Sequence, residues 1–195
     1  MKNQYALSDK TIDDFYIIER ADFVIIVALA GNDLLLVRQY RPATDKFYTA
    51  LPAGYLEPGE SPEDCARREL LEETGYTAGD CHLIAKFDPL PGYIKSAAHV
   101  VLCTATSKLN AVIDAKEIAE IIKVPFSQAL AMIMRREIDE MQTVSAILIA
   151  KEYLPHNNTS NKKWPCQIKK LSVTTEGEMD LALRDYLDFW DLWGW

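Results

Sequence analysis

Three glutamates near the middle of the chain restrict its local structure more than any other feature. Glu69, Glu72 and Glu73 stand at positions i, i+3 and i+4 within residues 54–76, and Glu60 precedes them. In an α-helix this spacing places the three carboxylates on one face. Their mutual repulsion, added to the negative end of the helix dipole, destabilises such a helix. The pattern is therefore better explained by a helix whose carboxylates bind divalent cations than by stability alone.

The same region carries strong signals for where the helix begins and ends. Ser61 is a favoured N-cap residue, Pro62 fits the first helical position, and Asp64 completes a capping pattern with Ser61. Gly75 is a favoured left-handed C-cap residue. These signals predict a helix over residues 62–74.

The rest of the chain alternates short apolar, β-branched runs with turns, and two helical patterns follow. Gly31 and the two residues after it form a turn signal between two such runs, which predicts a hairpin. We expect an α+β fold. The predicted strands cover residues 15–18, 21–29, 34–39, 48–51, 81–88, 99–104 and 120–124, and the predicted helices cover 126–136 and 140–153.

Composition divides the chain into three parts. Residues 1–14 are polar and are expected to be a loose lead-in to a domain over 15–154. The segment 155–195 begins as a polar linker and ends in an acidic, aromatic stretch with apolar residues at helical spacing. We expect this last helix to pack on the domain or to form a subunit or partner interface.

Overall charge and composition narrow the class of protein. The chain has 195 residues, 49% hydrophobic content and a net charge of −8, which argues against a nucleic-acid partner. No apolar run reaches the roughly 18 residues of a membrane span, and the N-terminus lacks a signal-peptide core. We therefore expect a cytoplasmic protein with no membrane partner and reduced thiols. The cysteines, which have no zinc-site spacing, are Cys65, Cys81, Cys103 and Cys166.

Residues 54–76 also fill every fixed position of a longer motif, and we call this segment the box. It reads glycine, five residues, glutamate, seven residues, then Arg-Glu-apolar-any-Glu-Glu-any-Gly-apolar. In this the chain resembles the Nudix hydrolases. The resemblance implies a mixed sheet between helices and hydrolysis of a nucleoside diphosphate linked to another group. The matching residues are Gly54, Glu60, Arg68, Glu69, Leu70, Glu72, Glu73, Gly75 and Tyr76.

The resemblance assigns metal-binding roles within and beside the box. Glu69 and Glu73 are the implied main ligands of Mg²⁺, with Mn²⁺ as an alternative. Glu72 is implied to assist through a second metal or a water, and the carbonyl of Ala53 to complete a site. Carboxylate oxygens suit these hard cations. Taken without the rest of the motif, the acidic triplet would instead indicate a solvated helix face.

Two further box residues are expected to support this site. Arg68 lies four residues before Glu72, so on a helix it can pair with Glu72 and orient it. Glu60 is expected to brace the loop or to hold an outer-sphere water. We therefore predict Arg68 and Glu72 as catalytic residues.

Segments outside the box resemble the branch of the family that hydrolyses ADP-ribose and related nucleoside diphosphate sugars. Arg41 follows Val-Arg-Gln-Tyr, and residues 51–54 read Leu-Pro-Ala-Gly. The implied role of Arg41 is to bind the diphosphate, because guanidinium matches phosphate oxygens in a bidentate way. The alternative is a surface arginine that closes a strand. Many relatives carry a glutamate where this chain has Ala50.

A later loop is the second substrate signal. Pro91 lies 16 residues after Gly75, near the spacing that marks the ADP-ribose group, and Gly92 follows it. Tyr93 offers a stacking face and Lys95 adds positive charge, so all four loop residues are predicted to bind substrate. The Tyr-Ile-Lys run departs from the family pattern, which leaves another nucleoside diphosphate sugar as an alternative to ADP-ribose.

The attacking water needs a base, or a metal that makes hydroxide unaided. The resemblance places a glutamate in the loop before a late strand. Glu117 aligns best with that position and Glu120 is the alternative, while both could be ordinary loop charges. The predicted products from ADP-ribose are AMP and ribose 5-phosphate.

The resemblance also implies a homodimer that binds a small nucleotide-sugar substrate. Other activities on nucleoside triphosphates or on GDP- or UDP-sugars stay open at this stage. A protein of another class, a non-catalytic nucleotide sensor or scaffold, could keep the box and use its C-terminal segment to bind a partner. The complete carboxylate set argues against this last alternative.

Overall fold

The structure is a computed structural model that describes residues 2–6, 12–109 and 118–154. The predictions for Glu117 and for the segment 155–195 lie outside the described residues. Within the described ranges, no helix is long and apolar enough to cross a membrane.

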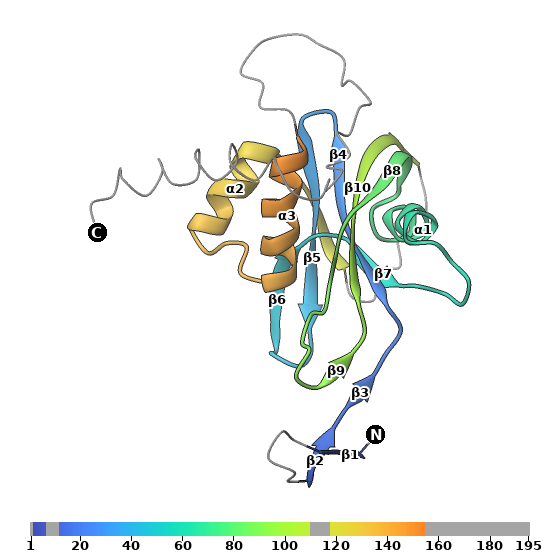
Figure 1. Ribbon diagram of the computed structural model, residues 1–195. Coiled ribbons are helices and arrows are strands. Elements are labelled where there is room, and N and C mark those ends of the chain that lie inside the picture. The colour runs from blue at the N-terminus through green and yellow to red at the C-terminus, as the bar shows by residue number, and fades with distance from the viewer. Residues whose placement is uncertain (1, 7–11, 110–117, 155–195) are drawn as a thin grey trace, which may run out of the picture. The chain divides into compact units, whose positions relative to one another are not determined.

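A seven-stranded mixed sheet forms the centre of the described fold (Figure 1). Its strands are β4 (Phe23–Ala30), β5 (Asp33–Arg41), β6 (Lys46–Ala50), β7 (Ala53–Tyr55), β8 (Tyr76–Phe87), β10 (Ala98–Lys108) and β11 (Ile118–Pro125). The main path runs in the order β11-β5-β4-β10-β8, while β6 pairs with β5 and β7 pairs with β4. Only β4 and β10 pair in parallel among these strands; the other pairings are antiparallel.

Helices cover both faces of this sheet (Figure 1). The helix α1 (Pro62–Thr74) packs on one face, and α2 (Phe126–Met134) and α3 (Met141–Tyr153) pack on the other. This is the α+β arrangement that the sequence predicted, with a mixed sheet between helices. The predicted helix over 62–74 is confirmed at both ends.

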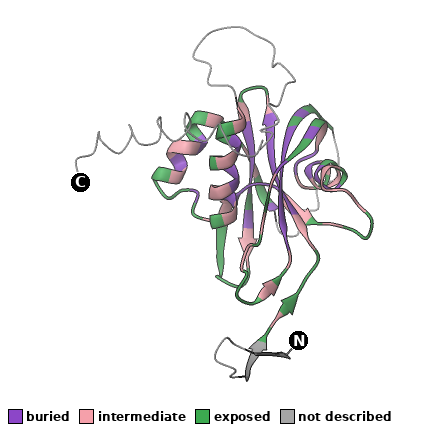
Figure 2. Ribbon diagram, viewed as in Figure 1, coloured by how far each residue is buried: buried purple, intermediate pink, exposed green. Residues whose placement is uncertain are grey.

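The central strand β4 shows why the sheet is buried on both sides. Ile25 and Val27 pack in the apolar cluster under α2 and α3, whereas Val24 and Ile26 pack in the cluster under α1. Figure 2 shows this buried zone along the middle of the sheet. Because neither face meets solvent, the strand reads as a continuous apolar run and not as an alternating one.

The sheet opens between β4 and β5, and this opening positions the box. The two strands pair only next to their connecting turn, at Leu29–Leu34 and Ala30–Asp33. Beyond these pairs β7 takes the place beside β4, with Ala53 opposite Ile25. The peptide that leads into the box is thus fixed by backbone pairing to the most buried strand of the sheet.

Several short elements differ from the sequence predictions. Antiparallel strands β1 (Lys2–Ala6) and β2 (Ile12–Tyr16) form a two-stranded sheet where we predicted a loose lead-in over 1–14. The strand β9 (Ile94–Lys95) pairs in parallel with β3 (Ile18–Glu19) and was not predicted. These elements are two to five residues long, too short to show a periodic pattern of their own.

The described cysteines are buried thiols without disulfides. Cys65, Cys81 and Cys103 are free and buried, and burial is the main cause that raises the pKa of Cys65 to about 12. A thiol with so high a pKa stays protonated and unreactive at neutral pH. This agrees with the structural role predicted for Cys65, while Cys166 lies outside the described ranges.

Candidate active site

The helix α1 has the caps that its sequence predicts, and these fix its carboxylates in space. The Ser61 hydroxyl accepts a hydrogen bond from the Asp64 N–H at 3.2 Å. Gly75 adopts a left-handed φ of 72° and donates to the Leu71 carbonyl at 2.9 Å. The face of α1 that includes Leu70 is buried against the sheet. The neighbouring acidic residues therefore line the edge of the helix that faces the start of the box, where residues 56–61 form a loop that we call the box loop.

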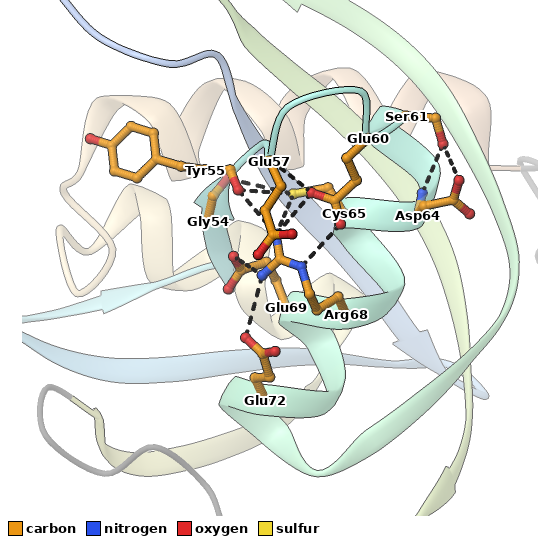
Figure 3. Close-up of polar contacts among 10 residues, drawn as sticks. All are labelled: Gly54, Tyr55, Glu57, Glu60, Ser61, Asp64, Cys65, Arg68, Glu69 and Glu72. Atoms are coloured by element: carbon orange, nitrogen blue, oxygen red, sulfur yellow. Dashed lines mark hydrogen bonds and ion pairs between the residues drawn. The ribbon is translucent and has the colours of Figure 1, made fainter.

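Arg68 is the centre of the polar contacts in the box (Figure 3). Its guanidinium forms a bidentate pair with Glu60, at 3.0 Å from Nε and 2.9 Å from Nη2. It also contacts Glu69 at 2.6 Å and Glu72 at 3.4 Å, and donates to the Tyr55 carbonyl at 3.1 Å. The predicted pairing with Glu72 is present, but it is the longest of these contacts. The contacts of Arg68 with Glu60 and Glu69 were not predicted from the sequence.

This arrangement changes the explanation for the acidic cluster. Arg68 lies between Glu60, Glu69 and Glu72, so one guanidinium offsets part of the repulsion that the sequence pattern predicts. The helix therefore forms without requiring that a metal neutralise every carboxylate. A bound cation would add to this compensation and would not be its sole source.

Glu60 connects the box loop to the helix. Its Oε2 atom accepts a hydrogen bond from the Glu57 N–H at 2.9 Å while the same carboxylate binds Arg68. The Arg68 guanidinium is the main cause that lowers the pKa of Glu60 to about 2. Glu60 thus stays ionised over the physiological pH range, and its contacts agree with the bracing role expected from the sequence.

Glu69 lies against the backbone at the start of the box. A Cβ atom built on Gly54 would lie 1.9 Å from the Glu69 Cδ, a distance that no side chain allows. A side chain at this position would therefore displace the Glu69 carboxylate, which fills that space next to the backbone. Burial is the main cause that raises the pKa of Glu69, and the neighbouring Arg68 opposes this shift.

Glu73 contacts the same stretch of backbone. Its Oε2 atom accepts a hydrogen bond from the Ala53 N–H at 3.1 Å. Glu69 and Glu73 therefore both lie at the Ala53–Gly54 segment, and they are hard oxygen donors of the type that Mg²⁺ and Mn²⁺ prefer. In the described part of the chain, no three acidic, histidine or cysteine side chains already surround one metal position. The donor set fits a divalent cation in its chemistry, with two carboxylates placed in advance.

Arg41 ends β5 and forms an ion pair outside the box. Its Nη2 lies 3.4 Å from Glu140, and 37% of the Arg41 side chain is exposed. Glu140 accepts from the Thr143 hydroxyl at 2.6 Å, and that hydroxyl accepts from the Leu51 N–H at 3.1 Å. A chain of hydrogen bonds thus links Arg41 to the backbone that leads into the box. No sequence pattern indicated a role for Glu140.

The predicted substrate loop is exposed. Pro91, Gly92, Tyr93 and Lys95 all lie at the surface, and Lys95 forms an ion pair with Glu19 at 3.3 Å. The strand pairing of β9 with β3 holds this loop at the end of the sheet where β4 begins.

The two candidates for the base differ in what the structure shows. Glu117 lies outside the described residues. Glu120 is an exposed residue of β11, and its backbone pairs with Arg38 of β5. The assignment of the base stays a prediction.

Comparison with known proteins places these features in context. Residues 19–143 match the NUDIX domain. The chain is 34% identical over 134 residues to the ADP-ribose pyrophosphatase of Bacillus subtilis (strain 168), covering 67% of this chain and 72% of that protein. It is 32% identical over 145 residues to the methanol dehydrogenase activator of Bacillus methanolicus, covering 72% and 78%.

A solved structure shows the same fold. The crystal structure of an ADP compounds hydrolase superposes with a TM-score of 0.71, and the alignment covers 78% of this chain and 83% of that one. The two sequences are 24% identical, so this likeness supports the architecture alone.

The Glu60–Arg68 pair predicts a specific pH dependence of stability. Because the folded-state pKa of Glu60 is depressed to about 2 from 4.5, its contribution is present above pH 4.5 and is lost as the pH falls toward 2. Urea unfolding of the wild type and of Glu60→Gln should therefore show the largest difference at pH 7. A difference that stays constant from pH 7 to pH 2.5 would contradict this account.

Proposed function

This chain belongs to the NUDIX family and is a Nudix hydrolase, and from that premise we propose that it cleaves the diphosphate bond of a nucleoside diphosphate sugar. ADP-ribose is the first candidate, with AMP and ribose 5-phosphate as products. The observation that carries the proposal is the complete box, in which Arg68 contacts Glu60, Glu69 and Glu72, while Glu69 and Glu73 lie against the Ala53–Gly54 segment. The name of the Bacillus subtilis relative supports ADP-ribose as the substrate to test first.

We propose that Mg²⁺, or Mn²⁺ in its place, is held by Glu69, Glu72, Glu73 and the Ala53 carbonyl. When bound, such a cation offsets charge on the diphosphate and lowers the pKa of a bound water. The chain's own contribution is to fix the ligands. Arg68 limits the rotation of Glu69, and the Ala53 N–H orients Glu73.

In the proposed reaction, the oxygen of a water attacks one phosphorus and the anhydride bond to the other phosphorus breaks. Glu117 accepts the proton of the water, with Glu120 as the alternative base. Arg41 binds the diphosphate oxygens, which requires its guanidinium to share or leave Glu140. The residues Pro91, Gly92, Tyr93 and Lys95 border the sugar or the base.

A homodimer in the cytoplasm stays part of this proposal. A non-catalytic role in partner binding is the alternative. It is supported by the name of the Bacillus methanolicus relative, which is an activator of another enzyme, methanol dehydrogenase. The two roles differ in the need for the box carboxylates. Hydrolysis requires the Glu73 carboxylate as a metal ligand, whereas binding a partner through another surface does not depend on its charge.

The metal ligands can be tested by comparing hydrolysis by the wild type, Glu73→Gln and Glu63→Gln. With ADP-ribose and Mg²⁺, we expect Glu73→Gln to lower kcat by about 100-fold or more, because it removes a charged metal ligand. The Glu63→Gln control changes the same residue type in the first turn of α1, where an amide oxygen can still accept from the Leu83 N–H. The control should keep kcat within about twofold of the wild type.

The assay should include UDP- and GDP-sugars, dinucleoside polyphosphates and nucleoside triphosphates, with the released nucleotide identified by chromatography. Chelation of divalent cations should stop turnover, and added Mg²⁺ or Mn²⁺ should restore it. Near-normal activity of Glu73→Gln would contradict the assignment of the metal ligands. A preference for triphosphates would contradict the substrate class alone.

Arg41 can be tested against a neighbouring cation. Arg41 and Lys46 are paired in the β5–β6 register, and each forms an ion pair with an acidic residue of the α2–α3 connection. We expect Arg41→Ala to raise KM by about tenfold or more, since a hydrogen bond to a charged group contributes about 1.5–3 kcal/mol. Lys46→Ala should leave KM nearly unchanged. Equal effects of the two substitutions would contradict a specific role for Arg41.

A further inference from the structure

Asp22 makes contacts at the start of β4 that the proposed chemistry does not use. Its Oδ1 atom accepts a hydrogen bond from the Ala97 N–H at 2.8 Å. Its Oδ2 atom lies 3.0 Å from Nε2 of His99. Its backbone carbonyl accepts from the Leu56 N–H at 2.9 Å. One residue thus contacts β10, the segment before it, and the box loop.

His99 is a buried residue, and its ring and the Asp22 carboxylate hold each other in place. The residue is only 7% exposed, and its position in β10 pairs with Val24 of β4 and Lys86 of β8. Its Nδ1 atom has no hydrogen-bond partner among the described residues, so Asp22 is the group that anchors the ring. The hydrogen bond from His99 is the main cause that lowers the pKa of Asp22, and the Ala97 N–H adds to it. The carboxylate therefore stays ionised and accepts charge-assisted hydrogen bonds.

The segment that reaches Ala97 is the predicted substrate loop. Its backbone follows residues 18–22 closely: the Tyr93 carbonyl accepts from the Ile18 N–H at 2.8 Å, and the Lys95 carbonyl accepts from the Arg20 N–H at 3.2 Å. In addition to these bonds and the Lys95–Glu19 ion pair, the Asp22 carboxylate accepts from the Ala97 N–H, and the Ala97 carbonyl accepts from the Phe23 N–H at 3.0 Å. The exposed side chains of Tyr93 and Lys95 are carried by this backbone.

On the other side, Asp22 contacts the box loop. Leu56 lies two residues after Gly54, whose backbone is in contact with the Glu69 carboxylate. Because the bond from Leu56 goes to the Asp22 carbonyl, it does not depend on the Asp22 side chain. Substituting the side chain therefore removes the link from Asp22 to the Ala97 N–H while the attachment of the box loop stays in place.

We propose that Asp22, anchored by His99, is a positioning residue that holds the 93–97 segment in register with the box loop for substrate binding. The inference rests on the proposed function, because it assigns the 93–97 segment to the same substrate. Asp22 acts on KM more than on kcat, since Arg68 and the Ala53 N–H orient the box carboxylates independently of it.

The experiment compares Asp22→Ala, Asp22→Asn and a matched control, Asp33→Ala. Asp33, the first residue of β5, also has a partly exposed carboxylate next to a strand terminus, and it pairs with Lys123 at 3.3 Å. It lies at the end of β4 opposite to Asp22. Asp22→Ala should raise KM by about tenfold with kcat within about threefold of the wild type. Asp22→Asn keeps an oxygen that can accept from the Ala97 N–H, so its KM should stay within about threefold. Asp33→Ala should not change KM.

Hydrogen exchange of the Ala97 amide gives a measurement that does not depend on turnover. We expect exchange at Ala97 to be faster in Asp22→Ala than in Asp22→Asn and the wild type. An unchanged KM in Asp22→Ala, an equal rise in Asp22→Asn, or a loss of activity that only follows the unfolded fraction would overturn the inference. If the wild type hydrolyses no nucleotide sugar, the proposed function fails, and unchanged exchange at Ala97 would separately remove the anchoring role of Asp22.

Discussion

The box depends on one guanidinium placed among carboxylates that would otherwise repel one another. Arg68 donates to both carboxylate oxygens of Glu60, contacts Glu69 and Glu72, and donates to the Tyr55 carbonyl. Its planar fork of donors makes these contacts in fixed directions, which a flexible ammonium does not do. The loop, the helix and the acidic edge of the helix are thereby held in one arrangement. The same contacts that stabilise the loop also restrict the groups proposed to bind the metal.

Backbone geometry supplies the second part of the site. β7 pairs with β4 at Ala53 and Gly54, and this fixes the two peptides that Glu73 and Glu69 contact. The absence of a side chain at Gly54 allows a carboxylate to approach the chain, and the Ala53 N–H orients the other. Chemistry on a diphosphate relies mainly on positioning and on charge stabilisation. A site built on a buried strand and a capped helix provides the positioning.

Local signals in the sequence predicted the helix well because its determinants are local: Ser61 and Gly75 lie at its two ends and act through their own backbone. The contacts made at a distance were not predictable in the same way. Arg68 lies on α1 and Glu60 eight residues before it in the preceding loop, and Arg41 and Glu140 are 99 residues apart. No periodic pattern links such pairs, because the course of the loop before α1 and the placement of β5 beside the start of α3 bring them together. The roles of Glu140 and Asp22 came only from the structure.

The central claim is that the fork of Arg68, and not its charge alone, sets the box carboxylates for catalysis. The most direct test is kcat for Arg68→Lys at saturating substrate and Mg²⁺, with Arg67→Lys as the control. Arg67 is the neighbouring residue on α1, but it contacts the Gly79 carbonyl and Cys81. The account predicts that Arg68→Lys lowers kcat by about 10- to 100-fold while Arg67→Lys stays within about threefold. Wild-type kcat in Arg68→Lys would contradict it.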